Sequence, residues 1–318
     1  MIGAKRARGV ALITAMLITA LTGSLAAGLA WDNALDVRRT MVLLFHEQGQ
    51  QVALGAESWI RNILRDDGIE SQTDHLGELW ASELPGLPVD NDSVQGAVTG
   101  NIEDLQGRFN VNNLVDSNGE VNKDLLEQFQ RLLIILDIDP RFAGLTADWI
   151  DPDQDAGHPE AGNLDGAEDS IYTGLTPPYR TLNRALSNVT ELAALEGMDQ
   201  ASFNALLPHV TALPAGTQIN VNTATPVVLQ SLDANLDAAA VERLLEEREE
   251  AGFGDFSGTF STLVTNPAIF AQLTESSSFF QLKAVVQIGT VRVTYYSVLS
   301  RSPSGGPVTT ILRSLGTI

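Results

Sequence analysis

The chain has 318 residues, 44% of them hydrophobic, so it can bury the cores of about two domains of ordinary size. Its 40 Asp and Glu residues against 19 Lys and Arg residues give a formal net charge of −21, which argues against a broad nucleic-acid surface because phosphate binding requires clustered basic side chains. The absence of Cys excludes disulfides, Cys-ligated zinc, iron–sulfur clusters and cysteine nucleophiles.

The first thirty residues combine a basic start with a long uncharged stretch. Lys5, Arg6 and Arg8 precede an apolar run from Val10 to Ala30. As a helix this run would be about 31 Å long, which is enough to cross the hydrocarbon core of a bilayer. Because the basic flank of a membrane helix stays in the cytoplasm, we expect the acidic remainder of the chain outside it. A cleaved secretory signal is the alternative, but its apolar core would be only about 7–15 residues long.

The helical pattern continues beyond the apolar run. No helix breaker follows Ala30, and apolar residues recur at helical spacing, interleaved with Arg, Glu and Gln, as far as Leu64. The natural stop is Asp66–Gly68. We therefore predict one helix from Val10 to about Arg65, roughly 80 Å long, with its first half in lipid and its second half packed on a domain.

The C-terminal end of the chain reads as β-structure, and the middle reads as helix. Phe279–Ile288, Gly289–Ser302 and Val308–Leu315 alternate and are rich in Val, Tyr and Thr. Strand-like pieces also follow the long helix, the last of them ending at Leu114. The strongest helical segments between these regions are Val121–Leu136, Leu182–Leu195 and Ala238–Glu250. A sheet interrupted by a long helical stretch predicts an inserted domain.

Carboxylates gather in the loops after Trp149. Asp151, Asp153 and Asp155 alternate along one loop, and Glu168 and Asp169 follow a Gly-rich stretch. Like charges this close repel unless something neutralises them, and oxygen-rich loops achieve this by binding Ca²⁺ with about 6–8 ligands. Composition alone favours the alternative of a solvated acidic loop.

A nucleic-acid-binding module is the rival interpretation of one segment. Gln218–Pro226, with the apolar residues that follow it, resembles helix-hairpin-helix modules, and Thr225-Pro226 makes a good helix start. DNA-binding hairpins use Gly so that backbone N–H groups can approach a phosphate. The corresponding hairpin, Asp233–Asp237, has two carboxylates and no Gly. We therefore expect no nucleic-acid partner and interpret the module as a packing or protein-contact scaffold.

The sequence carries no recognisable catalytic motif. The four His residues are scattered, and neither a zinc-protease motif, a nucleophile elbow nor a phosphate-binding loop is present. An anchored periplasmic hydrolase that uses the acidic cluster remains the enzyme alternative.

The start of the chain resembles the prepilin signal of type IV pilins and type II secretion pseudopilins. The residues that carry this resemblance are Arg6–Gly9 (RARG), followed directly by Val10–Thr14 (VALIT). The resemblance implies that a prepilin peptidase cleaves after Gly9, that Val10 becomes the methylated amino terminus, and that the helix stays in the inner membrane with the body in the periplasm. Most pilins carry Glu at the fifth mature position, which here is Thr14. A subunit without this Glu is expected at the tip of a filament.

Over its whole length the chain resembles the protein K family of minor pseudopilins in type II secretion systems. The resemblance implies an α+β fold, in which a long N-terminal helix packs on an antiparallel sheet and a large all-α domain with helix-hairpin-helix-like units is inserted between strands. The implied parts are a leader (1–9), a transmembrane half-helix (10–30), a pilin-like domain (31–114 and 276–318) and the inserted α-domain (115–275).

The same resemblance implies a calcium site. The segments Trp149–Asp153, Gly166–Asp169 and Pro178–Asn183 look like the pattern that carries bound calcium in this family. The implied ligands are Asp151, Asp153, Glu168 and Asp169, with Asp155 as a further candidate. The role of the Ca²⁺ ion would be structural, because it would tie together two loops that otherwise repel each other.

The function that the resemblance implies is structural and not enzymatic. The chain would join the I and J minor pseudopilins in a tip complex that primes pseudopilus assembly for protein export across the outer membrane. Its bulky α-domain would forbid the stacking of another subunit above it. The alternative is a minor pilin of a related type IV pilus, and the sequence alone does not separate the two.

Overall fold

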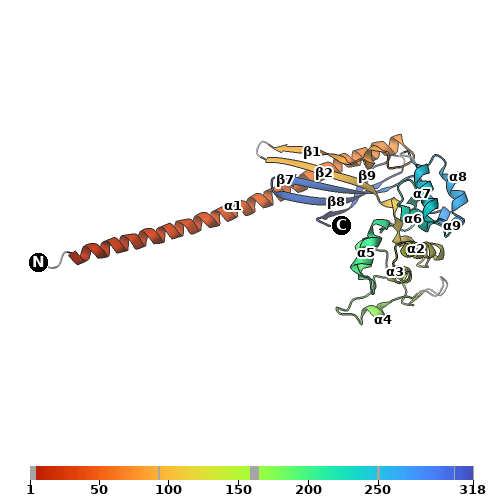
Figure 1. Ribbon diagram of the computed structural model, residues 1–318, viewed down its shortest axis with the longest axis horizontal. Coiled ribbons are helices and arrows are strands. Elements are labelled where there is room, and N and C mark those ends of the chain that lie inside the picture. The colour runs from red at the N-terminus through yellow and green to blue at the C-terminus, as the bar shows by residue number, and fades with distance from the viewer. Residues whose placement is uncertain (1–4, 92–93, 158–164, 249–250, 304, 318) are drawn as a thin grey trace.

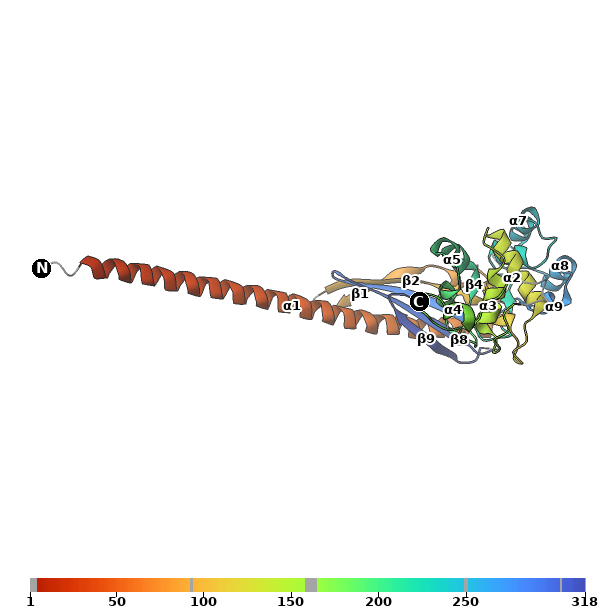
Figure 2. The same cartoon turned by 90° about the horizontal axis from the view of Figure 1, so that it is seen from below.

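One long helix carries the body of the protein at its C-terminal end (Figures 1 and 2). The computed structural model describes residues 5–91, 94–157, 165–248, 251–303 and 305–317. Helix α1 (Lys5–Glu70) has 66 residues and is therefore about 100 Å long. Its N-terminal part is long and apolar enough to cross a membrane. The predicted single helix is thus confirmed.

Helix α1 runs past its predicted stop at Arg65. Gly68 lies within the helix, and the Ser71 N–H donates to the Asp67 carbonyl (2.8 Å) to close the last turn. The Arg301 side chain packs directly against Gly68, where a Cβ would lie 3.2 Å from Arg301 Cδ. The contact with Arg301 therefore offsets the cost of Gly in a helix, which the sequence pattern could not show.

The second half of α1 packs on a five-stranded sheet. The strands are β1 (Leu84–Asn91), β2 (Val94–Asp104), β7 (Phe279–Ile288), β8 (Val291–Arg301) and β9 (Val308–Leu315). Their spatial order is β1-β2-β7-β8-β9, and neighbouring strands are antiparallel. This arrangement confirms the predicted antiparallel sheet and the three predicted C-terminal strands.

Strands β2 and β7 are neighbours in space although most of the body separates them in sequence. Their register runs from Gly96 opposite Ile288 to Asp104 opposite Phe280. The chain therefore leaves the sheet after Asp104 and returns beside the same point at Phe279. The intervening residues form a helical part at the end of the sheet that is far from the N-terminus (Figure 1). The predicted insertion between strands is confirmed.

The core between α1 and the sheet is mostly apolar, and the carboxylate of Glu57 is buried in it. Ala53, Ile60 and Leu64 of α1 are buried against the sheet. Glu57 is 2% exposed and accepts hydrogen bonds from the sheet side chains Tyr295 (2.5 Å), Thr310 (2.7 Å) and Arg313 (2.8 and 3.0 Å). Burial opposes ionisation, but these bonds and the Arg313 charge outweigh it and hold the Glu57 pKa at about 2.

The helical part consists of short elements around its own core. Its helices are α2 (Lys123–Ile135), α3 (Phe142–Ile150), α4 (Asp169–Tyr172), α5 (Gln200–Leu206), α6 (Pro226–Ser231), α7 (Ala238–Glu247), α8 (Phe256–Leu263) and α9 (Pro267–Phe270). Its 3-10 turns and short strands are η2 (Leu105–Gly107), β3 (Phe109–Asn110), η3 (Val111–Leu114), η5 (Val189–Ala194), η6 (Leu207–His209), β4 (Val210–Thr211), β5 (Ile219–Asn220) and β6 (Leu273–Thr274). Another 3-10 turn, η1 (Leu79–Ala81), follows α1.

Two of the predicted elements are corrected. The helix predicted over Leu182–Leu195 is only the 3-10 turn η5, because Asn183 has a positive φ of 48° and Asn188 caps the turn with Glu191. The strand-like piece predicted to end at Leu114 has only a two-residue strand, β3, followed by η3. Phe109, Val111 and Leu114 are buried in the core of the helical part.

A buried polar network joins the helical part to the sheet. Asp104, at the end of β2, accepts hydrogen bonds from the hydroxyls of Ser277 and Thr223 (both 2.5 Å) and from Asn220 Nδ2 (3.1 Å). Asn220 also donates to the Asp74 carbonyl (3.0 Å). Burial raises the Asp104 pKa to about 6. Side chains from both parts of the body therefore share one buried carboxylate.

Candidate metal centre

The predicted acidic cluster lies where helix α3 ends and helix α4 begins. Asp151 follows α3, and its N–H donates to the Ala147 carbonyl (2.9 Å). Glu168 directly precedes α4. Asp151 and Glu168 are each only 2% exposed, whereas Asp153 lies at the surface. Each of these three side chains offers a carboxylate oxygen, and the three oxygens lie within 4.8 Å of one another.

Glu168 is the acid whose environment most favours a cation. Its Oε2 accepts hydrogen bonds from Gln154 Nε2 (3.1 Å) and Thr181 Oγ1 (3.2 Å). Its Oε1 is buried and receives no hydrogen bond from any residue that the structure describes. Burial, and then the charges of Asp148 and Asp151, raise the Glu168 pKa to about 7. A cation beside these oxygens would remove this penalty.

Asp148 is a neighbour of the cluster that sequence reasoning missed. It is fully buried and lies one helical turn before Asp151, so both side chains emerge on the same face of α3. Its Oδ2 accepts a hydrogen bond from the Gly157 N–H (3.2 Å), and a Cβ at Gly166 would collide with the same oxygen. The spacing of three residues between Asp148 and Asp151 at a helix end is the sequence pattern that could have indicated Asp148 as part of this site.

The other two predicted ligands lie beside the group of three. The Asp169 carboxylate forms an ion pair with Arg180 (3.0 Å) and accepts hydrogen bonds from the N–H and hydroxyl of Thr181 (both 3.0 Å). Asp155 is exposed, and its N–H donates to Asp153 Oδ1 (2.8 Å). Residues 158–164, which connect the two acidic loops, lie outside the described part of the chain.

A second acidic group shows how this protein neutralises carboxylates with its own cation. Asp67, Asp74 and Glu78 also bring carboxylate oxygens within 4.8 Å of one another. There Arg301, only 7% exposed, binds Asp67 (2.7 Å) and Asp74 (2.5 Å). Beside the Asp151 cluster, Arg180 pairs with Asp169 (3.0 Å), and the Arg180 side chain is 78% exposed.

The donor set of the Asp151 cluster suits Ca²⁺. Carboxylate oxygens are hard ligands, and Ca²⁺ is coordinated by oxygen at flexible geometry. Zinc and copper sites favour imidazole and thiolate, and neither is among the described side chains of the cluster. The buried Oε1 of Glu168 offers such an ion an oxygen that receives no hydrogen bond from the described part of the chain.

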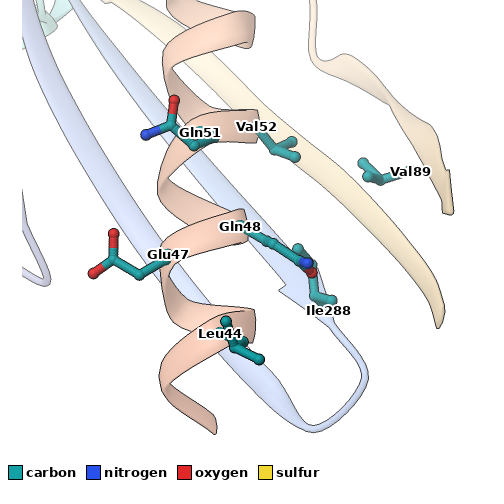
Figure 3. Close-up of a pocket in the computed structure, with 7 residues that line it drawn as sticks. All are labelled: Leu44, Glu47, Gln48, Gln51, Val52, Val89 and Ile288. Carbon is teal, nitrogen blue, oxygen red and sulfur yellow. The ribbon is translucent and has the colours of Figure 1, made fainter. Parts of the chain in front are cut away.

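The exposed apolar surface of α1 is a second candidate site. Beyond the predicted membrane segment, Leu35, Val42, Leu43 and Leu44 are all exposed. A groove of about 410 Å³ lies where α1 leaves the sheet. Figure 3 shows Gln48 and Val52 of α1 on the same side as Ile288 and Val89, with Glu47 and Gln51 on the other side.

Comparison with known proteins decides the family. The sequence matches the family described as "Type II secretion system (T2SS), protein K" over residues 107–215 and again over residues 219–267. Type II secretion system protein K of Pseudomonas aeruginosa is 34% identical over 310 residues, which cover 93% of this chain and 90% of that protein. The chain belongs to the type II secretion system protein K family.

Other relatives agree with this assignment. Protein K of Aeromonas hydrophila is 30% identical over 321 residues, covering 93% of this chain and 94% of that protein. A crystal structure described as the GspK–GspI–GspJ complex of enterotoxigenic Escherichia coli contains a chain with the same fold, with a TM-score of 0.74, 24% identity and coverage of 88% of this chain and all of that one.

Membership of the protein K family confirms the resemblance seen in the sequence. The protein is a minor pseudopilin of type II secretion, and the alternative of a type IV pilus is not supported. Both acidic loops lie within the first matched region. The family is a structural component of a secretion system. The long apolar helix of this chain fits a single membrane anchor.

Proposed function

We propose that the protein occupies the tip of the type II pseudopilus and primes its assembly together with I- and J-type minor pseudopilins. The observation that carries this proposal is the position of the helical part, which extends beyond the end of α1 on the side away from the N-terminus (Figures 1 and 2). Pilin-like subunits stack along the filament through their N-terminal helices. A bulky part at the distal end of the body would collide with a subunit stacked above it.

The partners are inferred from the surface of α1 and from the structural neighbour. The neighbour's title describes a complex of GspK with GspI and GspJ. In this chain, the apolar side chains of α1 between Trp31 and Leu44 are exposed and extend toward the groove of Figure 3. An apolar surface of this length requires a protein partner once it leaves the membrane. The N-terminal helices of other minor pseudopilins have the required shape and chemistry.

The N-terminus fits a subunit with no neighbour ahead of it in the filament. Thr14 occupies the position where most pilins carry Glu, and its hydroxyl donates within the same helix to the carbonyls of Val10 (3.1 Å) and Ala11 (3.0 Å). The side chain is therefore satisfied without a partner, whereas an unpaired carboxylate in an apolar filament core would be costly.

Processing by prepilin peptidase after Gly9 would place the new terminus at Val10 and leave the body in the periplasm. Mass spectrometry of the protein from membranes is expected to find N-methyl-Val10. A free Trp31 terminus would show that the apolar run is a cleaved secretory signal and would contradict the membrane anchor.

Calcium is the structural cofactor in this proposal. Asp151, Asp153 and Glu168 would coordinate the ion directly, and Asp155 and Asp169 would be further carboxylates beside it. The ion would neutralise carboxylates that otherwise repel and would tie the loop after α3 to the start of α4. Its role is to fix the shape of the helical part, so the protein's work is structural and involves no turnover.

The position in the filament can be tested directly. In electron micrographs, pseudopili assembled with an epitope-tagged copy of this chain should carry gold-labelled antibody only at the filament ends. The tag belongs after Ile318, next to the exposed Thr317, so that it leaves the acidic loops unchanged. Label along the length of the filaments would contradict a tip position, and a major pseudopilin carrying the same tag provides the control for lengthwise labelling.

A further inference from the structure

The two edges of the sheet are protected very differently. Strand β1 forms one edge and contains Pro85 and Pro88, which lack the N–H groups that a further strand would need. Strand β9 forms the other edge, and its sequence, VTTILRSL, contains no Pro. Proteins commonly block exposed edges because an open edge pairs with other chains. The open edge of β9 is therefore a potential pairing site.

The hydrogen bonds of β9 to β8 show which backbone groups point outward. The Gly316 N–H donates to the Thr294 carbonyl (2.8 Å), and the Ser302 N–H donates to the Pro307 carbonyl (3.3 Å). Since bonded and non-bonded pairs alternate in an antiparallel ladder, these two bonds fix the register at both ends of β9. The residues of β9 whose N–H and carbonyl groups face away from β8 are Val308, Thr310, Arg313 and Leu315.

Only the first of these outward positions has a partner within the described structure. Arg61 Nε of α1 donates to the Val308 carbonyl (2.9 Å), which agrees with the outward orientation deduced from the ladder. From Thr310 to Leu315 the strand is the last of its sheet. This stretch can accept a further strand of about five residues.

A β-bulge gives the same stretch an apolar face. The register shifts between Val298 and Leu299, so Ile311 is an extra residue that has no partner of its own on β8. Ile311 and Leu312 consequently lie together on the face of the sheet opposite α1, where they are 54% and 40% exposed. Both line a cleft of about 560 Å³ that also contains Val298 and Leu213.

The opposite face of the same edge is basic. From Phe279 to Leu315 the chain has no Asp or Glu, although it has 40 in total. The Arg313 side chain lies on the α1 side, is 51% exposed and binds the buried Glu57. Arg61 lies one helical turn after Glu57 on α1 and donates to the Val308 carbonyl of β9. A strand added to β9 would therefore meet guanidinium groups on its α1 side.

We propose that the edge of β9 binds an extended segment of another protein as a sixth strand. The backbone of the segment pairs with the outward groups of Thr310, Arg313 and Leu315. Its alternate side chains are apolar over Ile311 and Leu312, and acidic beside Arg61 and Arg313. Recognition of this kind takes its affinity from main-chain hydrogen bonds and its specificity from alternate side chains. The proposal does not depend on the position of the protein in the pseudopilus.

A random library of eight-residue peptides displayed on phage, selected on the full chain in detergent micelles, tests this site. Selected peptides should carry apolar residues at every second position with Asp or Glu between them. Leu315→Pro removes an outward N–H and leaves the ladder to β8 intact, so it should weaken binding by about ten-fold or more in fluorescence anisotropy. Arg61→Glu leaves the ladder between β8 and β9 intact, although it removes the bond to the Val308 carbonyl, and it should weaken binding of the same peptides comparably.

Matched controls separate this site from others. Arg65→Glu reverses a charge one turn further along α1, where Arg65 pairs with Asp66, and should leave binding unchanged. The proposal is overturned if no peptide is selected, or if the selected peptides bind Leu315→Pro and Arg61→Glu as tightly as the parent chain. It is also overturned if the parent forms a dimer that Leu315→Pro abolishes in analytical ultracentrifugation, because β9 then binds a second copy of this chain.

Discussion

Glu57 shows how one residue fixes the long helix on the sheet. Its carboxylate accepts bonds from Tyr295 of β8 and from Thr310 and Arg313 of β9, so one side chain of α1 connects two strands that lie far away in sequence. Nothing in the helical pattern around residue 57 indicates this role, because a Glu on an amphipathic helix is ordinarily solvated. The three partners are brought to it only by the folded sheet.

We expect Glu57→Gln to lower the free energy of unfolding by about 3 kcal/mol at pH 7, because the pKa is held at about 2 instead of 4.5. A lowered pKa stabilises the fold above the unfolded value of 4.5, and this contribution is lost as the pH falls toward 2. The gap between parent and variant should therefore shrink by about half at pH 3. Urea unfolding of the full chain in micelles measures both values.

Glu47→Gln is the matched control for Glu57→Gln, because Glu47 is exposed on the same helix. It should change the unfolding free energy by less than about 0.5 kcal/mol. An equal effect of both substitutions at pH 7 would show that the buried network around Glu57 contributes nothing specific.

For the acidic cluster, the effect of Glu168→Gln on stability should change sign when calcium is added. Without the ion, the raised pKa of Glu168, about 7, means that stability falls as the pH rises from about 4.5 through 7. Glu168→Gln should then raise the melting temperature of chelator-treated protein at pH 7.5. With calcium at about 100 times its dissociation constant, the parent should gain about 2.7 kcal/mol, and the variant should gain much less.

Differential scanning calorimetry with and without a chelator measures these shifts. Asp151→Asn should likewise abolish most of the calcium-dependent gain, whereas Glu242→Gln, on the exposed face of α7, should retain it. If calcium changes neither the melting temperature nor the protease resistance of the parent, the assignment of the metal is wrong.

Helices with strongly periodic apolar residues or good capping residues were predictable from the sequence. Elements that are held by contacts with distant residues were not. Helices α2 and α7 follow their predicted segments, and Thr225 caps α6 before Pro226 as expected. The extension of α1 to Glu70 depends on Arg301, more than 200 residues away. The acidic site was predictable as a cluster of residue types, but its geometry was not, because the pairing of Asp169 with Arg180 is set by the fold.

The junction between sheet and helical part makes an element-scale prediction. Asp104→Ala leaves the donors of Ser277, Thr223 and Asn220 without their shared acceptor, so it should cost about 2–4 kcal/mol. The helical part should loosen from the sheet, and limited proteolysis should then cut the chain just after β2. Glu103→Ala removes the neighbouring carboxylate, which is 40% exposed and pairs with Arg108, and should leave the digestion pattern unchanged.

At the scale of the whole molecule, the insertion point separates two structural units that have different roles. The body has two distinct large cores, one between α1 and the sheet and one inside the helical part. The first core gives the pilin-like unit that packs in a filament, and the second gives the bulk that we propose ends it. The two are joined at a point where Asp104 and Phe280 already lie opposite each other.

Replacing residues 105–279 by Asn-Gly should therefore leave a folded pilin-like protein. A two-residue turn can connect antiparallel neighbours such as β2 and β7, and the core around Ile60 and Leu64 stays complete. Circular dichroism should show a cooperative melt of the shortened chain in micelles. If the helical part is what forbids stacking, gold label on this variant should appear along the pseudopili as well as at their ends. Gold label that stays at the filament ends would show that the preference for the tip lies in α1, where Thr14 replaces the usual Glu. In that case a second variant, Thr14→Glu, should be the one that spreads along the filament.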